Sequence, residues 1–183
     1  MKKLIIALII SMMIPVAFAQ KITGRWDCSK EMLQKLHFGT EEIYGTYKFK
    51  KNGTFVLKIK GETFDVDLSR VKKKKCNPDF IKRISVVIKG KYSLEDGKIS
   101  TDVNPRDIEC LCDFNGYSQI DNYVSDEEKL GAILTSEKQE MEIIASRVEK
   151  KVHNNPYFWS WHDEEVVCSG KKLEIGHRVH LEK

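Results

Sequence analysis

The segment that decides the fold is EEIYGTYKFKKNGTFVLKIKGETFDVDLSRV, residues 41–71. Its apolar side chains recur at every second position in three successive runs, which is the period of a strand with one buried face. The runs are separated by Asn52-Gly53 and by Gly61-Glu62. Asn-Gly accommodates the positive φ angles of a tight hairpin turn. We therefore predict three antiparallel strands joined by short turns. The side chains expected on their buried face are Ile43, Tyr47, Phe49, Phe55, Leu57, Ile59, Phe64, Val66 and Leu68.

The same alternation recurs along the rest of the chain. Residues 84–94, which include Tyr92, alternate cleanly, and a turn at 95–97 leads to a further alternating run at 99–103. The pattern returns in residues 108–114 and near the C-terminus. We expect seven or eight short strands, each about half apolar, with every strand beside the next one in the chain. This arrangement indicates an antiparallel up-and-down barrel.

Two segments depart from the alternation. Residues 125–152 place their apolar side chains on one helical stripe, and Ser125 opens a capping box. We predict one long amphipathic helix there, or two with a break near 135–136. A shorter helix is expected at 30–37, capped by Ser29. The predicted fold is thus mainly β, a barrel of about eight strands with one long and one short helix.

The N-terminus has the pattern of a secretory signal peptide. Lys2 and Lys3 precede an uncharged run, residues 4–19, that ends in the small-residue sequence AFA. The run is shorter than the ~20 apolar residues of a membrane-spanning helix. We expect cleavage after Ala19, with a retained signal anchor as the alternative. Residues 20–183 then form a single domain in the periplasm or outside the cell, with no transmembrane segment.

The overall charge balance excludes few partners by itself. The net charge of the chain is +4, and loss of the two leader lysines lowers it to +2. Because positive and negative charges nearly cancel, we predict no general attraction to nucleic acid or to an acidic membrane. The local exception is a loop with four consecutive lysines, Lys72, Lys73, Lys74 and Lys75. This loop is a candidate protein interface, or a solvated loop that keeps the edge of a sheet soluble.

Five cysteines follow the leader: Cys28, Cys76, Cys110, Cys112 and Cys168. In an exported chain the expected state is disulfides, and an odd number leaves at least one thiol over. We expect a disulfide between Cys28, on the first strand, and Cys168, on the next-to-last strand. Cys110 and Cys112 leave two options open: disulfides with Cys76 or another partner, or a metal or redox site. A C-x-C pair lacks the spacing of zinc and thioredoxin motifs.

An aromatic segment stands between the long helix and the last hairpin. NNPYFWSWHDEE, residues 154–165, holds Tyr157, Phe158, Trp159 and Trp161. These rings either anchor the helix to the barrel, or form the wall of an apolar pocket or an interface anchor. The chain has no nucleophile, phosphate-loop or dinucleotide motif. We therefore predict no catalytic site, no cofactor and no metal.

Gly24-Arg25-Trp26, which precedes the meander, resembles the lipocalins and the lipocalin-like exported proteins of bacteria. The resemblance implies that Gly24 and Trp26 lie on the first strand and that the indole helps to close one end of the barrel. It also implies that Arg178, on the last strand, packs over that indole. The chain departs from the family in placing its helix before the final two strands, and Val103 replaces the tyrosine of the family's T-D-Y motif.

The resemblance implies a non-enzymatic exported protein that binds a small apolar or amphipathic ligand inside the barrel. An eight-stranded barrel is just wide enough for its own side chains or for one small ligand. One alternative is therefore a filled barrel that serves as an interaction module, an inhibitor or surface component that uses the lysine loop, Trp159 and Trp161. A thiol or metal protein that uses Cys110 and Cys112 is the third. The candidate ligand contacts are Tyr47, Phe49, Phe55, Phe64 and Tyr92.

Overall fold

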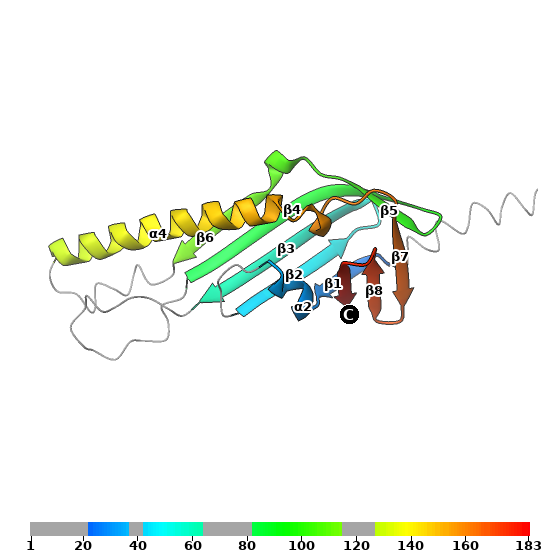
Figure 1. Ribbon diagram of the computed structural model, residues 1–183, viewed down its shortest axis with the longest axis horizontal. Coiled ribbons are helices and arrows are strands. Elements are labelled where there is room, and N and C mark those ends of the chain that lie inside the picture. Colours follow the sequence, from blue (N-terminus) through cyan, green and yellow to red (C-terminus); the bar gives the residue numbers. More distant parts are fainter. Residues whose placement is uncertain (1–21, 37–41, 64–81, 115–126) are drawn as a thin grey trace, which may run out of the picture.

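The computed structural model describes residues 22–36, 42–63, 82–114 and 127–183 (Figure 1). Its strands are β1 Gly24–Cys28, β2 Glu42–Phe49, β3 Thr54–Thr63, β4 Lys82–Glu95, β5 Lys98–Asp102, β6 Glu109–Phe114, β7 Glu164–Ser169, β8 Lys172–Ile175 and β9 Val179–Glu182. Its helices are α2 Lys30–Gln34, α4 Glu127–His153 and two short 3-10 helices, η1 Pro105–Asp107 and η2 Pro156–Phe158. Among these described helices, none is long and apolar enough to cross a membrane.

Eight of the strands form a closed antiparallel barrel. The order around the barrel is β1-β2-β3-β4-β5-β7-β8-β9, and β9 pairs again with β1. The closing ladder joins Asp27 to Glu182 and Cys28 to Leu181. Apart from the step from β5 to β7, each strand lies beside the next one in the chain. The predicted mainly β, up-and-down fold with one long and one short helix is confirmed.

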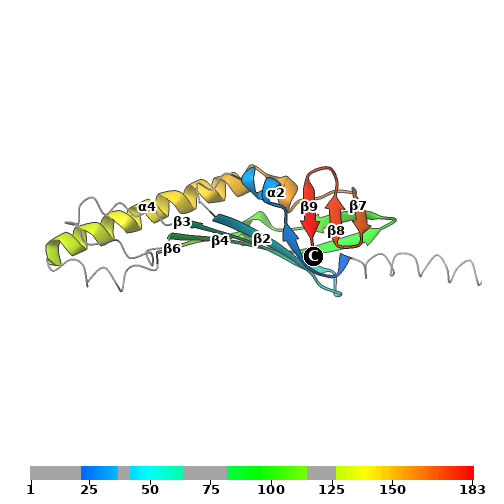
Figure 2. The same ribbon diagram turned by 90° about the horizontal axis from the view of Figure 1, so that it is seen from below.

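The ninth strand, β6, lies outside the barrel because β4 is long enough to have three neighbours. β4 has 14 residues and pairs with β3 along one edge. On its other edge, residues 91–95 pair with β5 and residues 82–87 pair with β6. β2, β3, β4 and β6 therefore extend past the barrel as a four-stranded wing, and α4 lies over one face of it (Figures 1 and 2). We refer to these four strands as the wing.

The long helix is a single element. α4 runs for 27 residues without a break at 135–136, which selects the first of the two predicted forms. Met141, Val148 and Val152 are buried. Three strands follow α4 rather than the two expected, because a turn at residues 176–178 divides the last alternating stretch into β8 and β9. The predicted cap at Ser125 lies outside the described residues.

Of the two turns predicted in the opening segment, only the first is confirmed. Gly53 adopts a φ of +74°, and the turn is closed by a hydrogen bond from the Lys50 amide to the Thr54 carbonyl. The turn expected at Gly61-Glu62 is wrong, because β3 continues through both residues to Thr63. The long β4 supplies ladder partners for this stretch, with Gly61 opposite Ile84. The strand expected at 64–68 lies outside the described residues.

The short helix packs tightly against the barrel wall. Ser29 caps α2 as predicted, since its hydroxyl accepts a hydrogen bond from the Met32 amide at 3.3 Å. Leu33 is buried and approaches Gly45 of β2. A Cβ atom at position 45 would lie 2.7 Å from the Cys28 sulfur and 2.8 Å from the Leu33 Cδ2. Glycine at this position therefore allows the end of β1 and α2 to lie close to β2.

Candidate functional site

The barrel interior contains the aromatic side chains that were predicted to contact a ligand. Tyr47, Phe49 and Phe55 are at most 1% exposed, and Tyr92 is half-buried. Their rings contact one another: the centroids of Tyr47 and Phe49 are 5.9 Å apart, and those of Phe49 and Tyr92 are 5.3 Å apart. The contacts between these rings mean that this part of the interior is filled by the protein's own side chains. Phe64 lies outside the described residues.

The aromatic segment is anchored in this interior cluster. The Trp161 ring lies 5.8 Å from both the Phe55 and the Tyr47 rings. The Tyr47 hydroxyl donates a hydrogen bond to the Phe158 carbonyl at 2.5 Å. Burial raises the pKa of Tyr47 well above its ordinary value, so the hydroxyl stays a neutral donor. Residues 156–161 are thereby fixed to the barrel from inside, and Trp159 is also buried.

Trp26 is the middle residue of β1 and lies opposite Tyr47 of β2 in the ladder. It is fully buried, and its indole donates to the Ile22 carbonyl at 2.6 Å. Gly24 has a φ of +127°, which disfavours any residue with a Cβ. The expectation that Arg178 covers the indole is wrong: the cation over Trp26 is Lys183, 4.1 Å from the ring centroid. The antiparallel ladder of β1 and β9 explains this. Asp27 pairs with Glu182, so Lys183, which follows Glu182, lies beside Trp26, which precedes Asp27.

Arg178 instead belongs to a hollow at the other end of β9. This end hollow, of about 570 Å³, lies between the aromatic segment and the turn that joins β8 to β9. Trp161 and Ile175 are each 2% exposed and form its apolar floor. Tyr157 is half-buried in its wall. The residues that line it are Asn154, Asn155, Pro156, Tyr157, Ser160, Trp161, Glu164, Ile175, Gly176, His177 and Arg178.

The lining of the end hollow contains one guanidinium, from Arg178, and one carboxylate, from Glu164. The Arg178 guanidinium lies 5.6 Å from the centroid of the Tyr157 ring. Burial raises the pKa of Tyr157 and Arg178 lowers it in part, so the phenol is neutral near pH 7. Within the part of the chain that the structure describes, Arg178 forms no ion pair with a carboxylate. An aromatic wall, an apolar floor and an unpaired guanidinium suit an amphipathic molecule with an anionic group.

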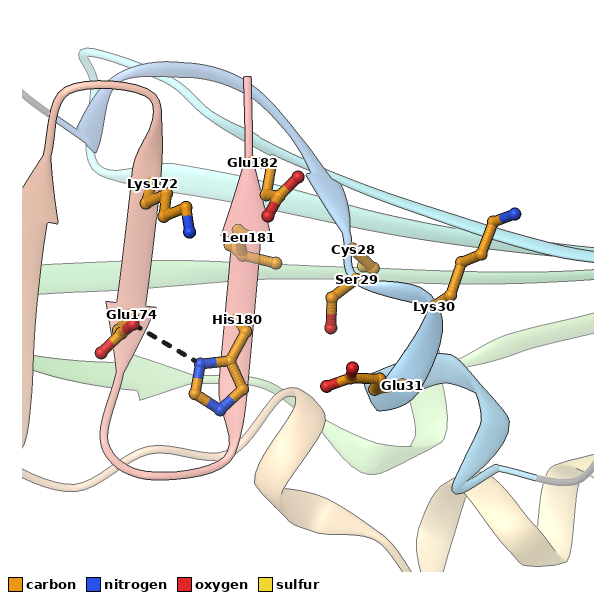
Figure 3. Close-up of a pocket in the computed structure, with 9 residues that line it drawn as sticks. All are labelled: Cys28, Ser29, Lys30, Glu31, Lys172, Glu174, His180, Leu181 and Glu182. Atoms are coloured by element: carbon orange, nitrogen blue, oxygen red, sulfur yellow. Dashed lines mark ion pairs between the residues drawn. The ribbon is translucent and has the colours of Figure 1, made fainter.

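A second hollow, of about 380 Å³, lies outside the barrel where β1 meets β9 (Figure 3). Its charges are largely compensated: the carboxylates come from Glu31, Glu174 and Glu182, and the ammonium groups from Lys30 and Lys172. Glu174 also lies 3.8 Å from His180 on the neighbouring strand. No group of three or more His, Cys, Asp or Glu among the described residues is placed to hold a metal ion. Among the described residues this side hollow therefore offers no metal site, and its carboxylates outnumber its ammonium groups, which disfavours an anionic ligand.

The expected disulfide between Cys28 and Cys168 is wrong. The ladder places the two residues in one row, with Cys28 opposite Leu181, Leu181 opposite Leu173, and Leu173 opposite Cys168. Strands β9 and β8 stand between them, a separation of three strand spacings or about 14 Å. Disulfide-bonded residues have Cα atoms within about 7 Å. The error arose because Cys168 lies on β7, the third strand from the end.

Cys110 and Cys112 are half-buried on β6 and are not bonded to each other. They face Val86 and Ile84 of β4 in the ladder. Burial raises the pKa of Cys110 to about 11, with smaller contributions from Glu149 and Cys112. The thiol is therefore protonated near pH 7, which disfavours reactivity and metal binding. Cys76, Lys72, Lys73, Lys74 and Lys75 lie outside the described residues.

Only one half of the end hollow could be identified from the sequence. The aromatic segment stood out by composition, but the turn at 176–178 carries no motif. Barrel closure brings this turn to the aromatic segment, and closure is a property of the whole fold.

Comparisons of the chain with protein-family models, with curated proteins and with solved structures find no match.

Proposed function

We propose that this chain is a lipocalin-like, non-enzymatic binding protein that takes a small amphipathic anion in the end hollow. The apolar part of the ligand lies against Trp161 and Tyr157, and its anionic group pairs with Arg178. The observation that carries the proposal is the hollow itself, of about 570 Å³, which joins an aromatic floor to a guanidinium that forms no ion pair with any described carboxylate. That volume falls within the ~300–1,000 Å³ of small-molecule sites.

The packing of the barrel interior supports a ligand at the end of the barrel rather than among the interior rings. Tyr47, Phe49 and Phe55 contact one another and Trp161, and replacing such contacts by a ligand would require repacking of the core. In this proposal the interior aromatic residues support the floor of the site from behind. Trp161 is the connection, because it contacts the interior rings and also lines the hollow.

Calorimetric titration with dodecanoate tests the proposal, with dodecyltrimethylammonium as the probe of opposite charge. Dodecanoate should bind, and the cationic probe should bind at least tenfold more weakly. Arg178→Ala should weaken dodecanoate binding about tenfold or more, the size of one charged hydrogen bond. Arg25→Ala is the matched control, since Arg25 is exposed on β1 and pairs with Asp27 at 3.2 Å. Equal binding of both probes, or equal losses in both variants, would contradict the proposal.

Export is a further part of the proposal and rests on the sequence of residues 1–19. Expression of the full chain in a bacterial host, followed by fractionation and N-terminal sequencing, tests it. The expected product lies outside the cytoplasm and begins at Gln20. An intact N-terminus on a cytoplasmic protein would contradict export and leave the binding proposal unaffected.

A further inference from the structure

The outer face of the wing, which points away from α4, carries a concentration of positive charge. Successive side chains of a strand point to opposite faces of the sheet. Ile84, Val86 and Cys110 lie on the face toward α4, so the residues between them along each strand lie on the opposite face. No described helix lies on that opposite face (Figure 2). Its cross-strand rows are Tyr44-Lys60-Ser85-Leu111, Thr46-Lys58-Val87-Glu109 and Lys48-Val56-Lys89.

Cations outnumber carboxylates by six to four on this face, counted over the side chains that the structure describes. The cations are Lys48, Lys58, Lys60, Arg83, Lys89 and Lys91, and the carboxylates are Glu42, Glu62, Glu95 and Glu109. Two cations are paired, Lys89 with Glu109 at 2.6 Å and Arg83 with Glu62 at 3.4 Å.

The other four cations of this face, among the described residues, form no ion pair with a carboxylate: Lys48, Lys58, Lys60 and Lys91. Positive charge is thus concentrated on one face of a chain whose net charge is only +4.

Exposed apolar groups accompany these lysines. Leu111 is 62% exposed and Tyr44 is 55% exposed, and both lie in the cross-strand row that contains Lys60. Large apolar side chains at this exposure leave most of their surface in water, which burial at an interface would remove. A row of a tyrosine, a lysine, a serine and a leucine has the composition of a surface that enters the headgroup region of a lipid bilayer.

We propose that the outer face of the wing docks on an anionic lipid bilayer. The four unpaired lysines approach the headgroup phosphates, and Leu111 and Tyr44 insert at the level of the headgroups. A lysine ammonium group is a compact point charge without a fixed hydrogen-bonding geometry. It therefore suits a diffuse layer of phosphate groups better than a binding site that requires one fixed arrangement. Among its described side chains the face offers one aromatic ring, Tyr44, whereas single-stranded nucleic acid is bound by several stacking rings. An acidic protein would pair with the lysines but leaves the exposed Leu111 unexplained.

Cosedimentation with vesicles tests the proposal. The purified protein should sediment with vesicles of phosphatidylcholine and phosphatidylserine at a 7:3 ratio in low salt, and not with pure phosphatidylcholine. Lys58→Gln/Lys60→Gln should lower the partition coefficient roughly twenty-five-fold, since each lysine near an anionic surface contributes about fivefold. Leu111→Ser should lower it by a smaller factor that persists in high salt. Both changes are at exposed positions, and circular dichroism checks that the variants fold.

Lys171→Gln/Lys172→Gln provides the matched control, because it removes the same charge at the exposed turn between β7 and β8. The control variant should bind vesicles as the unchanged protein does. An equal loss in both double variants would show a general charge effect and overturn the assignment of this face. Absence of sedimentation with anionic vesicles, or binding to RNA or an acidic protein alone, would overturn the proposal. Arg178→Ala should not alter vesicle binding, so this test is independent of the ligand proposal.

Discussion

The Lys183 ammonium lies 4.1 Å from the centroid of the Trp26 ring, at the seam where β9 meets β1. This seam closes the barrel, and its ladder comprises only two residue pairs, Asp27 with Glu182 and Cys28 with Leu181. A cation over an indole face is attracted by the negative charge of the ring face. The contact therefore extends one of the two shortest junctions of the barrel, the other being that of β5 with β7, beyond its backbone ladder.

Lys183→Ala should destabilise the protein by removing this contact. We expect the free energy of unfolding to fall by about 0.5–1 kcal/mol, the range of a partly exposed cation–π contact. Urea unfolding followed by tryptophan fluorescence measures it. Arg178→Ala, which removes a cation from the other end of β9, should change stability less. If the Arg178 variant proved the less stable of the two, our placement of the two cations would be contradicted.

The hydrogen bond from Tyr47 to the Phe158 carbonyl gives a second prediction. Tyr47→Phe removes the hydroxyl and leaves a buried carbonyl without that donor. The free energy of unfolding should fall by about 1–2 kcal/mol. Tyr44→Phe is the matched control, because the Tyr44 hydroxyl is bonded to Glu42 on an exposed face. Equal stability of the two variants in urea would refute the proposed anchoring role of the Tyr47 hydroxyl.

Gly45→Ala should disturb the contact between β2, Cys28 and α2. The added methyl group would lie under 3.0 Å from both the Cys28 sulfur and the Leu33 side chain, so we expect a loss of about 1–3 kcal/mol. In a Cys28→Ala background the same change should cost less, because the closest atom is gone. A double-mutant cycle in urea measures the coupling. Strictly additive effects would show that the close approach at Gly45 does not limit packing.

The raised pKa of Cys110 predicts a pH dependence of stability. Between its ordinary value of 9.0 and about 11, the folded protein retains a proton that the unfolded chain loses. The folded state then binds more protons, so the free energy of unfolding must fall as pH rises through this range. Urea unfolding at pH 8 and pH 10.5, under reducing conditions, should show a smaller fall for Cys110→Ala than for the unchanged protein. Identical falls would mean that this thiol is not the linked group.

The alternation of apolar residues was enough to predict the barrel, because strand period and tight turns are local properties. Asn52-Gly53 was identified for that reason, and so was the Ser29 cap. Gly61-Glu62 was not a turn because the long β4 supplied a ladder for it, a tertiary effect that no local pattern records. The wing was not predicted for the same reason. It exists because β4 extends beyond its pairing with β5 and also pairs with β6.

The errors in side-chain assignments arose where strand number and register mattered. The lipocalin resemblance implied that Arg178 covers Trp26, but the register of β1 and β9 selects Lys183. Cys168 was paired with Cys28 because β7 was counted one strand too late. The positive outer face could not be seen in a near-neutral composition, because the lysines are concentrated only once the strands are laid side by side.

The most direct test of ligand binding in the end hollow is a titration with dodecanoate followed by the three indole N–H signals in proton–nitrogen NMR spectra. Each indole donates to a backbone carbonyl: Trp26 to Ile22, Trp159 to Val152, and Trp161 to Tyr157. Trp161 lines the end hollow, whereas Trp26 is not among the residues that line it. We predict a saturable shift of the Trp161 signal, lost in Arg178→Ala, with the Trp26 signal unchanged. A shift of Trp26 equal to that of Trp161, or no shift of Trp161 at saturating dodecanoate, would contradict a ligand site in the end hollow.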